Sequence, residues 1–179
     1  MLTKQETFEV IAGIRATVVL GFVLREEMNL LEIANKIRGQ RFGFERDGHV
    51  AHALDLTVLA ELLEAEESAQ ILRRNFGILL KQALIRHTFE LLRTYARGTG
   101  QESKFRQWPS YDFARLMRNI VSHGEGAVLE CWSPKTLTHA CWRHHVLTPA
   151  SVGVEVPLEP ADFMQLHEDM TNFLLTDLA

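Results

Sequence analysis

Apolar residues recur every three or four positions along most of the chain, which is the pattern of amphipathic helices. The first such segment starts at a capping box of Thr3 and Glu6 and continues to residue 37, with a kink expected near Gly21. Further segments with this period cover residues 55–67, 68–97, 110–124 and 160–175. We expect a bend at Gly77 in the longest of these. The pattern predicts a mainly α-helical protein.

After residue 127 the helical period ends, and apolar and polar residues alternate at neighbouring positions. Short runs rich in β-branched and aromatic residues follow one another between prolines, at residues 136–138, 141–147 and 152–156. They predict one or two short hairpins between Val128 and Leu158. Residues 39–48 carry three glycines and predict a loop, whose Arg41 and Arg46 are either solvated or in contact with a phosphate. Because no linker or repeat interrupts the chain, we predict a single domain over residues 1–179.

The segment 110–124 carries both a start and a stop signal for a helix. Ser110 is a favourable N-cap residue, and Asp112 places negative charge in the first turn, where the helix dipole favours it. Gly124 is the residue type that ends helices in the left-handed conformation. The sequence therefore predicts a helix with well-defined ends.

One side of this helix is apolar and the other is unusually polar. The apolar positions are Phe113, Ala114, Leu116, Met117, Ile120 and Val121. The polar positions are Asp112, Arg115, Arg118, Asn119, Ser122 and His123. We expect the first set to pack into the core. The second set presents two guanidinium groups, an amide, a hydroxyl and an imidazole on one surface.

Composition limits the partners that such a surface can have. The chain has 179 residues, of which 46% are hydrophobic and 23% charged, as in an ordinary soluble globular protein. Its formal net charge of −4 excludes a broadly basic surface, so a nucleic-acid contact must come from a local patch. Residues 68–97 are the most basic long segment, and ordinary surface charge is the simpler interpretation of their arginines.

Two features bear on the cellular compartment. Two cysteines are too few for a disulfide scaffold, and no signal peptide is recognised, so we expect a cytoplasmic protein. The apolar stretch 10–24 contains Arg15 and Thr17 and is shorter than the ~20 apolar residues that cross a bilayer. We therefore expect a helix that is buried on most sides, and no membrane partner. Small residues along it, Ala12, Gly13, Ala16 and Gly21, would let another helix approach closely.

The series Arg118-Asn119-x-x-x-His123 resembles the RNxxxH form of the R-x4-6-H signature of the HEPN superfamily (higher eukaryotes and prokaryotes nucleotide-binding). The likeness extends over residues 118–126 and to the layout, with long helices before the motif and a short β element and a helix after it. The resemblance implies an all-α (mainly) fold, a HEPN-like bundle of four to six helices with a small β-hairpin after the motif helix. It also implies a metal-independent endoribonuclease without a cofactor.

The motif residues suit the chemistry of RNA cleavage. His123 can move a proton near neutral pH, Arg118 can bind two phosphate oxygens, and Asn119 can orient the imidazole or bind a phosphate oxygen. The helix dipole favours protonated His123 and the nearby arginines oppose it, which leaves its charge open. We assign Arg115 and Ser122 to phosphate binding. The resemblance implies a homodimer that faces two motifs across one cleft and a 2′,3′-cyclic phosphate product. It further implies RNA as partner, a toxin–antitoxin or defence setting, and a cognate antitoxin or neighbouring defence protein.

Alternatives remain at the same residues. A histidine before a helix-ending glycine often caps free carbonyls, and Arg118 and Asn119 are compatible with a surface ion pair. The chain would then be a catalytically inactive HEPN-like module that binds RNA or a nucleotide, or a purely structural dimerisation protein. Separately, His139, Cys141 and His145 would share one face of a strand, and these are zinc-type ligands. Their spacing matches no zinc signature, so hairpin packing is the simpler interpretation. Cys131 is interpreted as a buried small hydrophobe.

Overall fold

The computed structural model describes residues 2–27, 29–46, 49–123, 128–133 and 135–179, with side chains for all of these except residues 27, 42–46, 49–54 and 123. In chain order the helices and strands are α1 (Lys4–Glu27), α2 (Leu30–Ile37), β1 (Arg41–Arg46), β2 (His49–Asp55), α3 (Thr57–Glu64), α4 (Glu66–Gln82), the π-helical turn η1 (Ala83–His87), α5 (Thr88–Gly98), α6 (Glu102–Arg106), α7 (Tyr111–His123), β3 (Ala140–Trp142), β4 (His145–Leu147), the 3₁₀ turn η2 (Pro149–Ser151) and α8 (Pro160–Thr176). The predicted fold class, mainly α with a small hairpin after the motif helix, is confirmed.

The chain divides into two compact units, each with its own internal packing. The first comprises Met1–Gly21 and Ile78–Ala179, and the second comprises Phe22–Gly77. The single domain over residues 1–179 stays a prediction.

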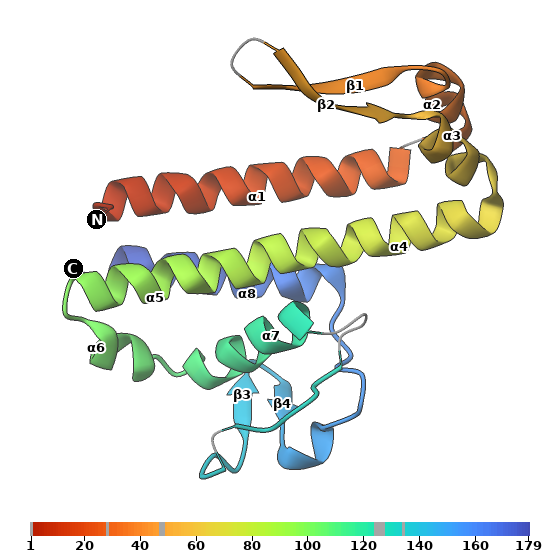
Figure 1. Ribbon diagram of the computed structural model, residues 1–179. Coiled ribbons are helices and arrows are strands. Elements are labelled where there is room, and N and C mark those ends of the chain that lie inside the picture. Colours follow the sequence, from red (N-terminus) through yellow and green to blue (C-terminus); the bar gives the residue numbers. More distant parts are fainter. Residues whose placement is uncertain (1, 28, 47–48, 124–127, 134) are drawn as a thin grey trace. The chain divides into compact units, whose positions relative to one another are not determined.

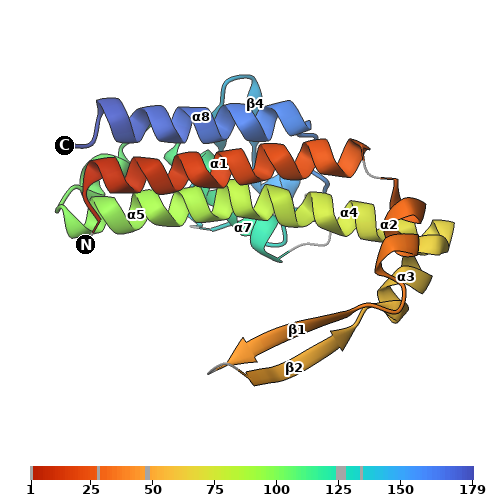
Figure 2. The same cartoon turned by 90° about the horizontal axis from the view of Figure 1, so that it is seen from above.

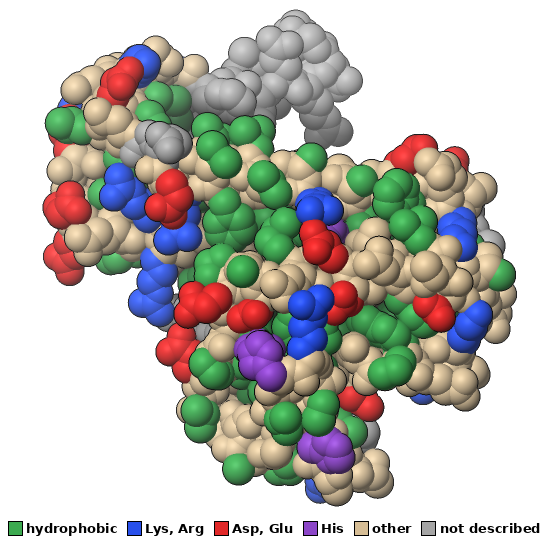
Figure 3. Space-filling model, turned by 180° about the vertical axis from the view of Figure 1, so that it is seen from behind, with side chains coloured by type: hydrophobic (Ala, Val, Ile, Leu, Met, Phe, Trp, Pro, Cys, Tyr) green, Lys and Arg blue, Asp and Glu red, His purple; other side chains and the backbone are tan. Residues whose placement is uncertain are grey.

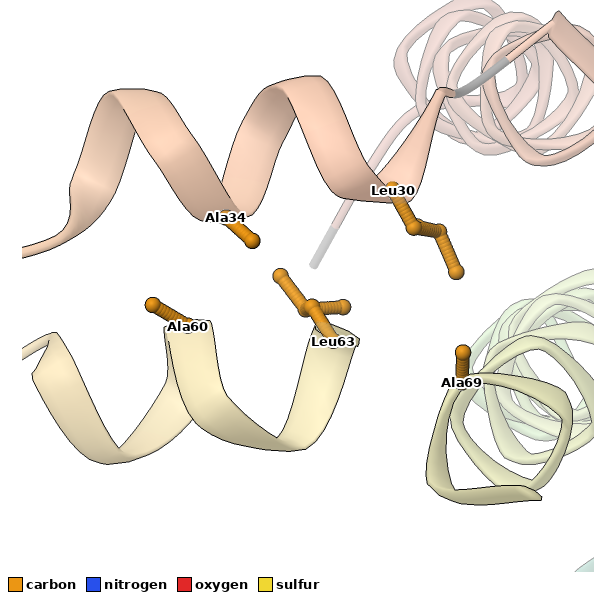
Figure 4. Close-up of a cluster of buried hydrophobic side chains, with 5 residues drawn as sticks. All are labelled: Leu30, Ala34, Ala60, Leu63 and Ala69. Atoms are coloured by element: carbon orange, nitrogen blue, oxygen red, sulfur yellow. The ribbon is translucent and has the colours of Figure 1, made fainter. Parts of the chain in front are cut away.

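The second unit is built on a pair of short helices. Leu30 and Ala34 of α2 face Ala60 and Leu63 of α3, and Ala69 of α4 completes this buried cluster (Figure 4). Asn29 caps α2, since its side-chain oxygen accepts the backbone N–H of Glu32 at 3.2 Å. That cap starts a new helix where the sequence predicted a single kinked one.

The loop predicted over residues 39–48 is wrong, because β1 and β2 form an antiparallel hairpin there. Phe42 pairs with Leu54 and Phe44 with His52, so the two aromatics are two residues apart, which is the strand period. We interpreted the glycines as breakers, but Gly43 lies inside the ladder opposite Ala53. Interstrand pairing therefore overrides the local preference of glycine for turns.

The first unit is a bundle around the long helices. The N-terminal part of α1, α5 and α8 run side by side, and α7 lies between η1–α5 on one side and the β3–β4 hairpin on the other (Figures 1 and 2). The capping box at the start of α1 is confirmed, with Thr3 N–H donating to Glu6 at 2.7 Å and Glu6 N–H donating to Thr3 at 3.2 Å. The bundle core holds apolar side chains from α1, α5, α7 and α8 that are fully buried, among them Ile11, Leu92, Leu116 and Leu166.

The long basic segment stays helical through Gly77, and the expected bend there stays a prediction. α4 runs into the π-turn η1, which leads directly into α5. A π-turn widens the helix by one residue and changes which side chains face a given neighbour after it. It contacts both α7 and α8, so it sets the faces that α5 presents to those two helices.

The β3–β4 hairpin is anchored on α8. Asp169 accepts a hydrogen bond from the indole N–H of Trp142 at 2.8 Å and pairs with the guanidinium of Arg143. Arg143 adopts the left-handed conformation (φ 52°) in the hairpin turn and donates to Gln165 at 2.7 Å. Trp142 also packs on Phe113 of α7, with ring centroids 5.5 Å apart. The hairpin thereby covers part of the apolar side of α7.

The helix α1 is far more exposed than the sequence predicted. Val10, Val19 and Leu20 are exposed, the last by 58% of its surface. The segment Lys4–Glu26 is long and apolar enough to cross a membrane, and only 22% of its most apolar part is buried. The expectation of a helix buried on most sides is therefore wrong. Length and composition are weak evidence for a membrane span, because core helices and signal sequences pass the same test.

Candidate nucleic-acid site on helix α7

The motif helix begins where its sequence signals predicted. It starts at Tyr111, directly after Ser110, whose carbonyl accepts the N–H of Ala114 at 2.9 Å. The described helix reaches His123, and the predicted stop at Gly124 lies outside the described residues. The predicted apolar positions are all buried: Phe113, Ala114, Leu116, Met117, Ile120 and Val121. Burial of this side fixes the helix and leaves the side chains of Arg118 and Asn119 on the opposite side.

Arg118 and Asn119 form a connected polar group on that opposite side. Arg118 Nη1 donates to Asn119 Oδ1 at 2.9 Å, and Arg118 Nη2 donates to a carboxylate oxygen of Glu90 on α5. The side chain of Arg118 is 28% exposed, and its buried Nε has no hydrogen-bond partner among the described residues. Two acceptors therefore hold the guanidinium in place and leave it further donors for a ligand.

Glu90 is the site residue that sequence reasoning missed. Its second carboxylate oxygen lies 3.6 Å from Arg93, so it bridges two arginines from different helices. Glu90 reaches α7 because α5 follows the π-turn η1, a change of helix register that the regular period did not reveal. One signal was available, since Glu90 is the only acidic residue between Glu67 and Glu102. A single carboxylate among several basic residues on one helix indicates an ion pair with a specific partner rather than a solvated side chain.

Arg115 and Ser122, assigned to phosphate binding, both make contacts within the chain. Arg115 Nε donates to Asp112 at 3.3 Å, and Arg115 Nη2 donates to the carbonyl of Ser133. Its side chain is 19% exposed and ties the segment after the helix to α7. Ser122 Oγ donates to the Arg118 carbonyl at 2.6 Å, one turn back. Phosphate binding by these two residues stays a prediction.

His123 is the last residue of α7, and its side chain lies outside the described residues. Its backbone position is one turn after Asn119, as the motif requires on a helix. The described part of the site thus brings Arg118, Asn119 and Glu90 together.

The zinc-type residues of the hairpin do not lie on a single strand. β3 begins at Ala140, after His139, and His145 opens the opposite strand β4. Cys141 is exposed, and His145 Nε2 lies 3.4 Å from a carboxylate oxygen of Asp162. Across the described ranges, no three histidine, cysteine or acidic side chains converge as metal ligands do. His145 stacks on Trp142, with ring centroids 5.5 Å apart. Cys131 is exposed as well, so its predicted burial is wrong.

Charge is mixed over the surface around these elements. On the face shown in Figure 3, acidic and basic side chains are interspersed and form no broad basic surface. Several of the arginines of α5 and α6 are paired, with Arg97 3.6 Å and Arg106 2.7 Å from the same carboxylate of Glu102. This distribution fits the formal net charge of −4. No protein-family model, curated protein or solved structure matches this chain.

Proposed function

We propose that this protein is a metal-independent endoribonuclease of the HEPN type, which acts as a homodimer. The observation that carries the proposal is the pairing of Arg118 with Asn119 on the exposed side of α7, with Glu90 fixing the guanidinium from a second helix. A fixed, partly exposed guanidinium with unused donors is suited to bind a phosphate diester. The toxin or defence setting and a partner antitoxin rest on the motif resemblance alone.

The proposed reaction needs no metal. The 2′-oxygen of a ribose attacks the adjacent phosphorus and loses its proton to a general base. The bond from phosphorus to the 5′-oxygen of the next nucleotide breaks, and that oxygen gains a proton from a general acid. The products are a 2′,3′-cyclic phosphate and a 5′-hydroxyl. Arg118 stabilises the charge that develops on the non-bridging oxygens, and His123 moves one of the two protons.

The second proton transfer is the reason for proposing a dimer. Each chain supplies one motif histidine, whereas cleavage by acid and base catalysis uses two titratable groups. A two-fold arrangement of two α7 helices would place a second His123 across the cleft. Two-fold symmetry is also the commonest arrangement among soluble oligomers.

The proposal is tested by incubating the purified protein with fluorescently labelled RNA in EDTA. We expect cleavage, which Arg118→Ala and His123→Ala each lower about 10²–10⁴-fold, the usual effect of losing a group that stabilises transition-state charge or a general acid–base group. The double variant should be little worse than either single one, because the members of one catalytic group are not additive. Arg118→Ala should lower the free energy of unfolding by only about 1 kcal/mol, because the ion pair is partly exposed and Arg93 stays beside Glu90.

Arg106→Ala is the matched control, since Arg106 is also a helical arginine paired with a glutamate. It should cleave as the wild-type protein does. If the Arg118 and His123 variants keep full activity, or if no RNA is cut, the catalytic proposal fails. A gel-shift assay on the same samples then shows whether the protein binds RNA without cutting it.

A further inference from the structure

A small recess opens beside Asn119 on the motif helix. It is lined by Asn119 and Ile120 of α7 and by Leu129, Glu130 and Cys131 of the segment that follows. Ile120 and Leu129 are 2% and 1% exposed and give the recess an apolar floor. Because Asn119 is hydrogen-bonded to Arg118, the recess lies next to the proposed phosphate site.

The outer wall of this recess is fixed by backbone pairing. Leu129 forms a bridge with Val152, and its carbonyl accepts the N–H of Gly153 at 2.9 Å. Val128 forms an antiparallel bridge with Glu155, whereas the Leu129–Val152 bridge is parallel. Arg115 binds the carbonyl of Ser133 further along the segment. The recess is therefore bordered by anchored backbone, and its shape is suited to selecting a ligand.

Its polar groups are a carboxylate acceptor and an amide donor. Glu130 is exposed and makes no hydrogen bond or ion pair with any residue that the structure describes. The oxygen of Asn119 is taken by Arg118, so the side chain offers its NH₂ group as donor. A free carboxylate repels a phosphate, so the anionic part of a nucleotide belongs at Arg118. The recess itself suits a neutral planar ring with N–H donors.

We propose that this recess binds a guanine base next to the phosphate that the enzyme cuts, an inference that rests on the proposed function. Guanine alone among the four RNA bases presents two adjacent N–H donors on its pairing edge, at N1 and N2. A carboxylate accepts both in a bidentate pair, and the Asn119 amide donates to O6 beside them. Adenine and cytosine each turn a ring acceptor toward Glu130 instead, and uracil offers a single donor.

The test uses RNA that differs in one amino group. A random RNA pool is cut and the ends are mapped, which should show guanine enriched at one fixed position beside the cut. In an oligonucleotide with that sequence, inosine then replaces guanine and removes only the N2 amino group. We expect kcat/KM to fall about 10-fold, the effect of one hydrogen bond to a charged acceptor. Glu130→Gln should lower the preference for guanine over adenine about 10–100-fold and make guanine and inosine nearly equal.

Glu155→Gln is the control, because it removes the same charge from an exposed residue near the recess that does not line it. It should keep the guanine preference. Cleavage without a base preference, or an equal effect of the Glu130 and Glu155 substitutions, overturns the guanine site and leaves the ribonuclease proposal standing. If no RNA is cut, the proposed function fails, and the guanine site is judged by anisotropy titration of the guanine and inosine oligonucleotides. Equal dissociation constants for the two would overturn it.

Discussion

His167 is a titratable residue held without charge in the bundle. Its side chain is 1% exposed, and Nδ1 lies 3.1 Å from the hydroxyl of Thr88, which is also buried. Burial, with a smaller effect of the positive charge of Arg15, lowers the pKa of His167 from 6.5 to about 4. Arg15 is itself paired with Glu168 at 2.6 Å. Protonation of His167 therefore opposes folding.

This depressed pKa predicts a loss of stability in mild acid. Between pH 6.5 and pH 4 the unfolded chain binds a proton at His167 and the folded chain does not, so the free energy of unfolding falls as the pH falls. The loss from this residue should reach about 2 kcal/mol at pH 5 relative to pH 8. Urea unfolding at a series of pH values measures it.

His167→Gln is the matched variant, because glutamine does not titrate and can still bond Thr88. Exposed carboxylates with lowered pKa values, such as Glu6 and Asp55, also weaken the fold in acid, but they are unchanged in the variant. The variant should lose less stability than the wild type over this range. Parallel curves for the two proteins would contradict the assignment.

At the scale of single residues, the sequence predicted the side of the helix on which a residue lies better than the residues with which it forms contacts. The helical period of residues 110–124 placed Arg118 and Asn119 correctly on the side of α7 away from the core. This placement depends only on the spacing of residues within one helix. Glu90 was missed because it contacts Arg118 on another helix, and the two residues are 28 positions apart in the chain. Cys131 was placed wrongly, since hydrophobicity alone does not say whether a segment after a helix is covered.

Two glycines in α1 offer a matched comparison at the scale of the element. A Cβ atom added at Gly13 would meet nothing within 4 Å, whereas one added at Gly21 would lie 2.5 Å from Leu80 Cδ2 and 3.1 Å from Leu80 Cδ1. Leu80 is 7% exposed and has little room to move. Gly21 thus permits the close helix approach that the sequence predicted, and Gly13 is on the exposed side.

We expect Gly13→Ala to raise the free energy of unfolding by about 1 kcal/mol, since alanine is the better helix former and nothing obstructs it. Gly21→Ala should lower it by about 1 kcal/mol, because displacement of Leu80 outweighs the same gain. Thermal or urea unfolding of the two variants measures the difference. Equal shifts in the same direction would show that Leu80 adapts freely.

Elements with their own start and stop signals were predicted well. The start of α8 at Pro160 follows from a capping box of Glu159 and Asp162 that acts within one turn. The hairpin β1–β2 and the π-turn η1 were not predicted. Both depend on partners: one strand on the other, and the π-turn on the two helices that it contacts.

At the scale of the whole molecule, the single imidazole of the motif leads to a prediction about assembly. We expect a species of twice the 20.4 kDa chain mass by light scattering at micromolar concentration. Because each cleft would need residues of both chains, the specific cleavage activity should fall on dilution in parallel with the dimer fraction. A 20.4 kDa species that keeps full activity on dilution would contradict the proposed arrangement.

The candidate site depends on the number of residues in the π-turn η1, and not only on which residue types the chain carries. A π-turn is equivalent to one extra residue inserted in an α-helix. Deleting a single residue between Ala83 and His87 would restore a regular helix and rotate the side chains of α5 by about 100° relative to the helix before the turn and to α7 and α8, which pack on the turn. Glu90 would then leave Arg118, and Thr88 would leave His167. Among homologous chains, an insertion or deletion of one residue at this turn would therefore change which side chains of α5 face α7 and α8. The residue type at position 90 would be comparable only between chains that share the turn.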